Sequence, residues 1–174
     1  TQKGREQGIR RLMSINLLKR LESSVYSFNL TLNRILALIK NTITAIDSFE
    51  KNGKADLDMY EASDSDFDID DENNDYFTVG KKVKMDLADM DYKTWRDELQ
   101  HDADTLELLT LMIADVTPEH DLKLQTLLHL LDEKMKHPIN EGNKKVLIFS
   151  AFSDTAEYLY DQVSAYMKSN YGLD

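Results

Sequence analysis

A single stripe of apolar side chains constrains the fold of this 174-residue chain more than any other feature. Neither proline nor glycine interrupts residues 9–52, and apolar residues recur there at alternating intervals of three and four, the heptad spacing of one buried helix face. We therefore predict one long helix over residues 4–50, stopped by Asn52 and Gly53. We expect the stripe to pack inside an intramolecular bundle, and a dimeric coiled coil is the alternative. The stripe consists of Leu18, Leu21, Val25, Phe28, Leu32, Ile35 and Ile39.

Two shorter helices are predicted in the second half of the chain. Asp91 suits the N-cap of a helix that runs to about residue 115, and Thr117 with Pro118 indicates the start of another that runs to about residue 136. Because only a short break separates these helices, we expect them to fold back on each other as an antiparallel hairpin. Their apolar faces comprise Trp95, Leu99, Leu106, Leu109 and Ile113 in the first, and Leu124, Leu127, Leu128, Leu131 and Met135 in the second.

An apolar run near the end of the chain has the length of a strand rather than that of a helix. Residues 145–149 contain Val, Ile and Phe, which favour buried strands, and a polar turn and a helical pattern follow. Ser153 or Asp154 is expected to cap that helix. Residues 144–174 are therefore predicted to form a strand, a turn and a helix. The predicted fold class is mainly α: a long helix and an antiparallel helical hairpin forming a bundle, followed by one strand-turn-helix unit of a truncated α/β lobe.

The predicted strand has few candidate neighbours within the chain. A strand without neighbours leaves its amide and carbonyl groups unpaired, and residues 78–85 are the only other segment with weak strand character. We therefore expect either local pairing or self-association of copies through the segment from Lys145 to Phe149.

The net charge of −11 is distributed unevenly along the chain. Ten acidic residues and no basic residue lie between positions 56 and 75, whereas positions 1–54 hold ten basic and four acidic residues. Repulsion between like charges and a scarcity of apolar groups predict that residues 55–75 form a mobile acidic loop. The overall charge therefore says little about partners, and its distribution matters more.

Two stretches of the chain resemble a known family. The first stretch, residues 148–155, contains Ile148, Phe149, Ser150, Phe152 and Thr155 in the order of a family motif. It resembles the fourth motif of superfamily 2 helicases and is nearest to the chromatin-remodeller-like (Swi/Snf-type) ATP-dependent DNA translocases. The second, residues 16–24, resembles the helical segment that follows the first motor lobe in bacterial members, and the two occur in the family's order. The resemblance implies that residues 1–136 are an inter-lobe helical region and that residues 144–174 are the first βα unit of the second RecA-like motor lobe.

The resemblance also implies which residues would meet nucleic acid. Ser150, Phe152, Ser153 and Thr155 would lie at the nucleic-acid backbone, where hydroxyl groups and the N-terminal amides of a helix suit phosphate. The alternative is that the phenylalanines belong to the core and that Ser153 only caps the helix. Basic residues of the first predicted helix are further candidates for phosphate contacts, with a solvated surface as the alternative: Arg10, Arg11, Lys19, Arg20 and Arg34.

The chain lacks the sequence of a catalytic centre. A helicase motor requires a glycine-rich phosphate loop, an Asp-Glu box and an arginine-rich segment, and none of these is present. His129, Glu133 and His137 are spaced four apart, but we interpret them as surface residues and expect no metal site. The sequence has no cysteine, and no apolar run approaches the ~18 residues of a membrane helix.

From these features we expect a fragment of a helicase-like, ATP-driven nucleic-acid translocase that is catalytically inactive alone and cytoplasmic. The fragment would bind no cofactor, whereas its parent would use ATP and Mg²⁺. The expected partners are the parent's missing motor lobes and nucleic acid, DNA in preference to RNA, with no membrane. The competing hypothesis is a stand-alone helical protein-interaction module with no motor activity.

Overall fold

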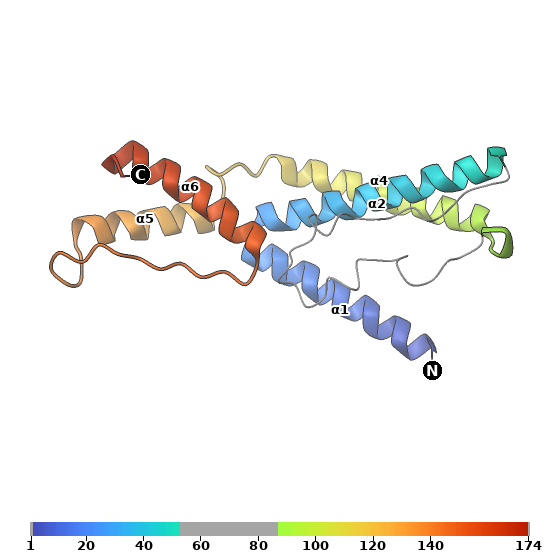
Figure 1. Cartoon of the computed structure of the whole chain (residues 1–174), viewed down its shortest axis with the longest axis horizontal. Coiled ribbons are helices and arrows are strands. Elements are labelled where there is room, and N and C mark those ends of the chain that lie inside the picture. Colours follow the sequence, from blue (N-terminus) through green and yellow to red (C-terminus); the bar gives the residue numbers. More distant parts are fainter. Residues whose placement is uncertain (1, 53–86, 174) are drawn as a thin grey trace.

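A computed structural model describes residues 2–52 and 87–173 of the chain. These residues form five α-helices and one short 3₁₀ turn, and within the described ranges there is no strand (Figure 1). The mainly helical class predicted from the sequence is therefore confirmed. The elements are α1 (Gln2–Ser23), α2 (Val25–Asn52), η1 (Leu87–Asp89), α4 (Tyr92–Ala114), α5 (Leu122–Lys136) and α6 (Ser153–Tyr171).

The single long helix predicted over residues 4–50 is wrong, because the chain reverses direction at Ser24 (Figure 1). The Ser24 amide donates to the Arg20 carbonyl at 2.9 Å and so closes α1. The Ser24 hydroxyl then accepts the amide N–H of Ser27 at 3.0 Å and so caps α2. Helix α1 and helix α2 lie together near this corner and diverge away from it (Figure 1). A serine that bonds to its own backbone competes with helix continuation, which hydrophobic spacing alone does not reveal.

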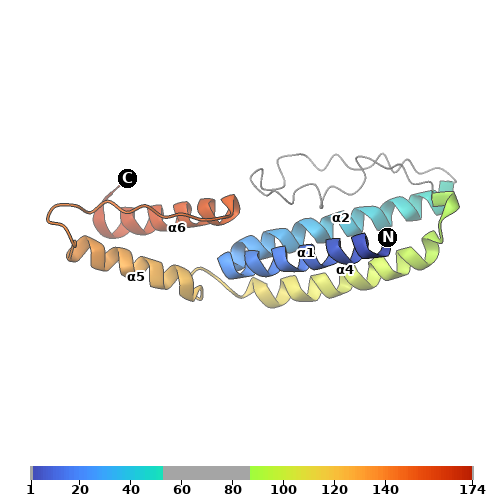
Figure 2. The same cartoon turned by 90° about the horizontal axis from the view of Figure 1, so that it is seen from below.

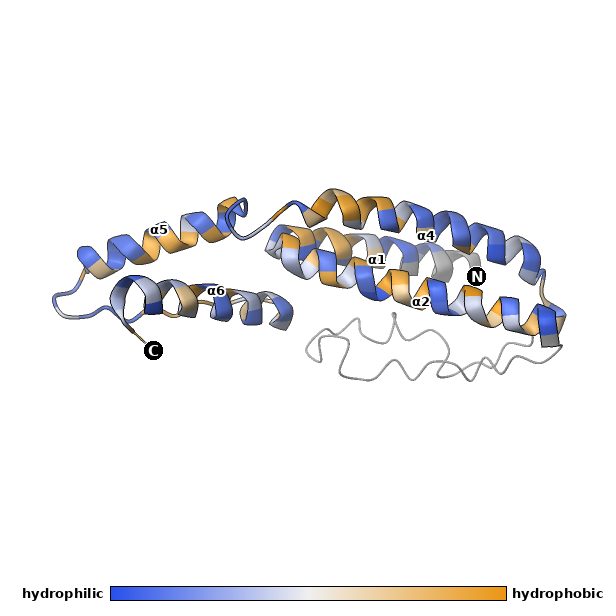
Figure 3. Ribbon diagram, turned by 90° about the horizontal axis from the view of Figure 1, so that it is seen from above, coloured by the Kyte–Doolittle hydropathy of each residue, from blue (hydrophilic) through white to orange (hydrophobic). Residues whose placement is uncertain are grey.

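Helix α4 runs antiparallel to α2 and packs along its length (Figure 2). The buried centre of this pair is formed by Leu36 and Ile43 of α2 and Ala103 of α4, which is 1% exposed. Asp91 caps α4 by accepting the amide N–H of Thr94 at 3.2 Å, as the sequence predicts. The partner of α4 is therefore α2, and the apolar faces of these two helices supply the first core (Figure 3).

Helix α5 does not fold back on α4, so the predicted antiparallel hairpin of these two helices is wrong. Residues 115–121 separate them, and α5 begins after Asp121, whose carboxylate accepts the amides of Lys123 and Leu124 at 3.1 Å each. From there α5 continues away from α4 (Figure 2) and packs against α6. The second core contains Leu124, Leu128, Leu131 and Tyr158. The periodicity of the apolar residues predicts which face of each helix is buried. It does not predict which other helix packs against that face.

The strand predicted at residues 145–149 is not confirmed, because residues 144–150 have no regular secondary structure. Helices α5 and α6 run in the same direction, and the segment between them returns along their length (Figures 1 and 2). Val146 and Ile148 are 44% and 43% exposed, whereas Leu147 and Phe149 are 82% and 88% exposed. Such an alternation in exposed fraction is typical of an extended backbone, in which successive side chains point to opposite sides. An extended segment becomes a strand only when a neighbour pairs with it, and none of the described residues does so. The predicted acidic loop at 55–75 and the segment 78–85 lie outside the described residues.

Candidate functional site, a buried ion-pair cluster

The first turn of α6 docks onto the corner between α1 and α2. Asp154 and Thr155 are 7% and 4% exposed, so these two polar residues are as buried as the core. The N-cap position is occupied by Phe152, whose side chain has no hydrogen-bonding atom, and Ser153 is the first helical residue. The expected capping by Ser153 or Asp154 is therefore wrong, because the Asp154 side chain points to α1 and α2 instead.

The carboxylate of Asp154 binds two guanidinium groups. Its Oδ2 accepts hydrogen bonds from Arg20 Nη1 of α1 and Arg34 Nη1 of α2, both at 3.0 Å. Its Oδ1 accepts a hydrogen bond from Arg34 Nη2 at 3.3 Å, so Arg34 binds the carboxylate in a bidentate manner through both terminal nitrogens. A bidentate arginine–carboxylate pair fixes the relative orientation of the two helices that carry its side chains. This single aspartate therefore joins three helices.

Hydroxyl groups surround the ion pairs. Thr155 Oγ1 lies 2.9 Å from Ser23 Oγ and 3.1 Å from Ser24 Oγ. Arg20 Nη1 also donates to Ser27 Oγ at 3.3 Å, and Ser27 is fully buried. The Arg20 guanidinium carbon lies 4.7 Å from the centre of the Phe152 ring, within the range of a cation–π contact. The hydroxyl and aromatic contacts offset part of the free-energy cost of burying these charges.

An aromatic pair lies one turn further along α6. The rings of Tyr26 on α2 and Tyr158 on α6 are stacked, with centroids 4.8 Å apart and an interplanar angle of 11°. The Tyr158 hydroxyl donates to Asp121 Oδ2 at 3.1 Å. Burial, followed by the negative charge of Asp121, raises the pKa of Tyr158 well above its ordinary value. The Lys123 ammonium donates to the Glu22 carbonyl of α1, so α5 is tied to the same corner.

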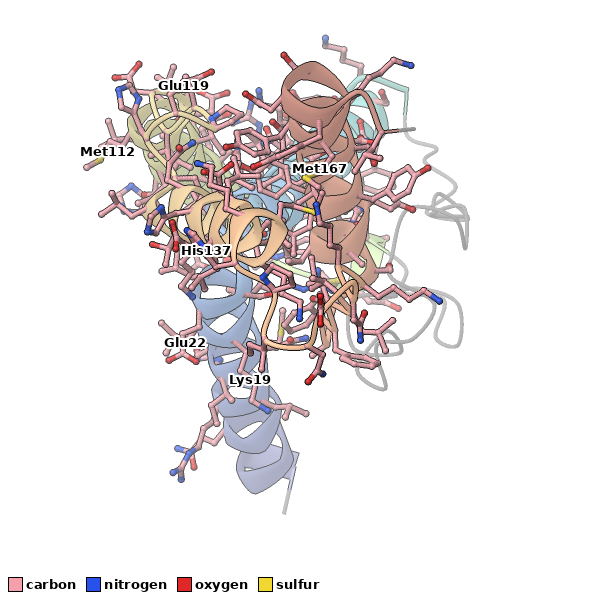
Figure 4. The ribbon with its side chains drawn as sticks, turned by 90° about the vertical axis from the view of Figure 1, so that its left-hand side faces the viewer. Lys19, Glu22, Met112, Glu119, His137 and Met167 are labelled. Carbon is pink, nitrogen blue, oxygen red and sulfur yellow. The ribbon has the colours of Figure 1, made fainter. Side chains whose placement is uncertain are left out.

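The structure brings only some of the predicted site residues together. Phe152, Thr155 and Arg20 meet in the buried cluster, where Arg20 contacts Asp154 rather than solvent. Ser150 and Ser153 are exposed at the approach to α6, and the Ser150 hydroxyl donates to the Phe152 carbonyl at 3.0 Å. The remaining candidates lie on exposed positions of α1, where Figure 4 shows Lys19 on the part of the helix that extends away from α6: Arg10, Arg11 and Lys19.

Sequence reasoning missed Asp154 as a site residue and did not predict its ion pair with Arg34, although a second stripe in the sequence indicates a buried polar network. Polar residues recur at intervals of four, four, three, four and three, beside the apolar heptads and in phase with them. The first five of these residues are buried and the last is half-buried. A polar stripe with core periodicity indicates a buried polar network. Its members are Asn16, Arg20, Ser24, Ser27, Thr31 and Arg34.

Residues 2–52 and 87–173 contain neither a metal-binding group of side chains nor a membrane-spanning helix. No group of three or more His, Cys, Asp or Glu side chains in these ranges is arranged to hold a metal ion. None of the helices described there has the length and apolar character needed to cross a membrane. Comparisons of the chain with protein-family models, with curated proteins and with solved structures find no match.

Proposed function

We propose that the chain is the inter-lobe helical region, together with the first unit of the second motor lobe, of a superfamily 2 helicase-like, ATP-driven DNA translocase of the Swi/Snf type. One observation carries this proposal. The two stretches that resemble the family, residues 16–24 and 148–155, are more than a hundred residues apart in sequence and meet at the buried cluster. Arg20, Ser23 and Ser24 come from the first stretch, and Asp154 and Thr155 lie in the second.

The path of the chain between α5 and α6 gives further support. In an α/β layer, parallel helices alternate with strands that run in the opposite direction. Residues 144–150 belong to the segment that connects two helices of the same direction and returns along their length (Figure 1), and the side chains of residues 146–149 alternate in exposure. Strands from another part of the parent would convert this extended segment into a strand of the motor lobe.

The role proposed for this chain is mechanical. A bidentate ion pair resists rotation of α6 against α2, so movement of the second lobe would be passed to α1, α2 and α4. Ser150 and Ser153 would contact the DNA backbone at the start of α6, where helix amides favour an anion. Thr155 and Arg20 would position that turn. The chain has no phosphate-loop sequence, so the proposal assigns ATP and Mg²⁺ to other parts of a cytoplasmic parent.

A test uses the complete parent protein and its DNA-stimulated ATP hydrolysis. Arg34→Lys keeps the positive charge but removes the bidentate contact with Asp154. We expect this variant to hydrolyse ATP normally without DNA and to lose about tenfold in stimulation by DNA, equivalent to about 1.4 kcal/mol of coupling. Arg96→Lys is the matched control, because Arg96 binds Asp47 in the same way at the far end of the α2–α4 pair. A complete protein that shows no DNA-stimulated hydrolysis would contradict the proposal.

A different observation favours the alternative, a helical protein-interaction module. The last two turns of α4 expose Leu108, Leu111 and Met112, which follow the spacing of a helix-packing face. Met112 points outward on the side away from α6 (Figure 4). The alternative requires a parent without ATP hydrolysis that binds a helical partner on this face. Loss of that binding in Leu111→Glu would support it.

A further inference from the structure

A small pocket lies beside the buried ion-pair cluster, where four segments meet. It has a volume of about 290 Å³, opens to the surface and is lined by the start of α2, the end of α4, the link before α5, and α6. Ligand pockets in proteins occupy roughly 300–1,000 Å³, so this pocket is the size for one side chain or a comparably small molecule. It does not include Arg20, Arg34 or Asp154, and the proposed function does not use it.

The charged groups that line the pocket are all negative. Asp121 and Asp161 contribute to its wall, and no lysine or arginine does so among the described residues. Asp121 is already occupied by the α5 amides and the Tyr158 hydroxyl. The Asp161 residue is exposed, and its carboxylate forms no hydrogen bond or ion pair with any part of the chain that the structure describes. The charges of Asp121 and Glu119 contribute to the raised pKa of Tyr158, which is consistent with a negative potential here.

The rest of the wall is mostly aromatic and aliphatic, and Asn29 and Gln162 add two amide groups. Tyr26 is stacked on Tyr158 and is itself 45% exposed, so its ring retains accessible surface. Val25, Ile113 and Val116 supply aliphatic surface. A cation is attracted to the face of a tyrosine ring, and a planar, weakly hydrated guanidinium also stacks on it and binds a carboxylate with two parallel hydrogen bonds. An ammonium group lacks the planar shape, and an anion would be repelled.

We propose that this pocket binds a guanidinium group carried on a short aliphatic chain. The Asp161 carboxylate pairs with the guanidinium, the Tyr26 ring lies against its plane, and the aliphatic wall contacts the methylene groups. Either a free small guanidine or an arginine side chain of a peptide supplies this chemistry. The proposal is independent of the motor function.

The test is an NMR titration of the ¹⁵N-labelled 174-residue chain with two pairs of probes. Butylguanidinium and its neutral isostere butylurea represent the free small molecule. A blocked Ala-Arg-Ala tripeptide and the same peptide with citrulline in place of arginine represent the peptide. We expect saturable shifts of the Tyr26, Asp161 and Gln162 amides with the charged probes and none with the neutral ones. Saturation by the tripeptide alone identifies a peptide as the source, and saturation by butylguanidinium identifies a free guanidine as sufficient.

Variants separate specific binding from general attraction to an acidic chain. Asp161→Asn should weaken binding about tenfold, because a charge-assisted hydrogen bond is lost. Glu157→Gln removes the same charge one turn away, outside the pocket, and should change binding less than about twofold. Tyr26→Leu should weaken binding about threefold, whereas Tyr26→Phe keeps the ring and should not. Equal losses in Asp161→Asn and Glu157→Gln, equal binding of charged and neutral probes, or no saturable shift would overturn the proposal.

Discussion

The carboxylate of Asp154 lies between two guanidinium groups in a place that water barely reaches. Its side chain is 9% exposed, the Arg20 side chain 3% and the Arg34 side chain 23%. Removing charged groups from water is costly, and their mutual attraction repays this only while every partner is present. Loss of this carboxylate would leave the Arg20 and Arg34 guanidinium groups facing each other without the negative charge between them. The stability of the corner therefore depends on Asp154 more than on any single hydroxyl around it.

We predict that Asp154→Asn lowers the free energy of unfolding by about 3 kcal/mol, the lower end of the range for breaking a buried ion pair, because Arg34 is partly exposed. Urea denaturation followed by circular dichroism measures this change. Glu157→Gln, on the exposed face of the same helix, should stay within about 0.5 kcal/mol of the unsubstituted chain. Equal effects of the two substitutions would show that the ion pairs do not hold the corner.

The contribution of Tyr158 to the free energy of unfolding is expected to depend on pH in the alkaline range. Burial and the charge of Asp121 raise its pKa in the folded chain above the ordinary value of 10.0. The unfolded chain therefore loses this proton first, and the contribution of Tyr158 to stability is complete below pH 10 and declines as the pH rises above it. Tyr158→Phe should cost about 1 kcal/mol at pH 7 through the lost hydrogen bond to Asp121. We expect the difference between the two chains to shrink between pH 9 and pH 11 (about one unit either side of the ordinary value), measured by urea midpoints, and a constant difference would contradict it.

At the scale of elements, the sequence predicts where helices occur better than how they are joined. The periodic faces of α4 and α5 and the Asp91 cap follow from local spacing and local hydrogen bonding. Helix partners depend on contacts between distant segments, which the spacing of one helix does not encode, so α4 was assigned to α5 rather than α2. Likewise the sequence indicates Arg20 and Thr155 as candidates. The contacts that place them in one cluster, Arg20 with Asp154 and Thr155 with Ser24, depend on the reversal at Ser24.

The reversal at Ser24 can be measured as a distance. The chain has no cysteine, so Arg10→Cys and Lys40→Cys introduce a single pair of spin-label sites on exposed positions of α1 and α2. A continuous helix would place thirty residues between them at ~1.5 Å each, or about 45 Å. The hairpin predicts a much shorter separation, because α2 returns past α1 (Figure 2). Pulsed electron–electron double resonance measures the distance between the two labels. A value near 45 Å would indicate a single continuous helix and contradict the hairpin. A pair at residues 93 and 108, both within α4, provides the reference for a continuous helix.

At the scale of the whole molecule, two apolar cores lie end to end and a polar junction joins them. The α2–α4 core and the α5–α6 core share no buried residue, and α6 contacts the first unit through Asp154, Thr155 and the Tyr26–Tyr158 stack. Polar contacts of defined geometry are more directional than apolar ones, so such a junction fixes orientation with little buried area. This arrangement suits the mechanical role proposed above. It also leaves the extended segment between α5 and α6 with an uncovered apolar face.

Because that apolar face is uncovered, we predict that copies of the 174-residue chain associate through residues 145–149. Leu147 and Phe149 point outward, and the backbone groups of residues 146–149 form no hydrogen bond with any described part of the chain. An extended apolar segment in this state pairs with an identical one, which satisfies both backbones and buries both rows of side chains. Light scattering over a dilution series should show a mass that rises with concentration.

Ile148→Pro should reduce this association, because proline removes an amide donor and does not fit within a ladder. Ile139→Pro is the matched control, since Ile139 is 90% exposed in the same link but lies outside the apolar run. Both variants should keep the helical circular dichroism of the original chain, because neither residue belongs to a helix. A chain that stays monomeric at every concentration would show that copies do not pair through this segment. Association that persists in Ile148→Pro would instead indicate that another surface, such as the exposed leucines of α4, mediates it.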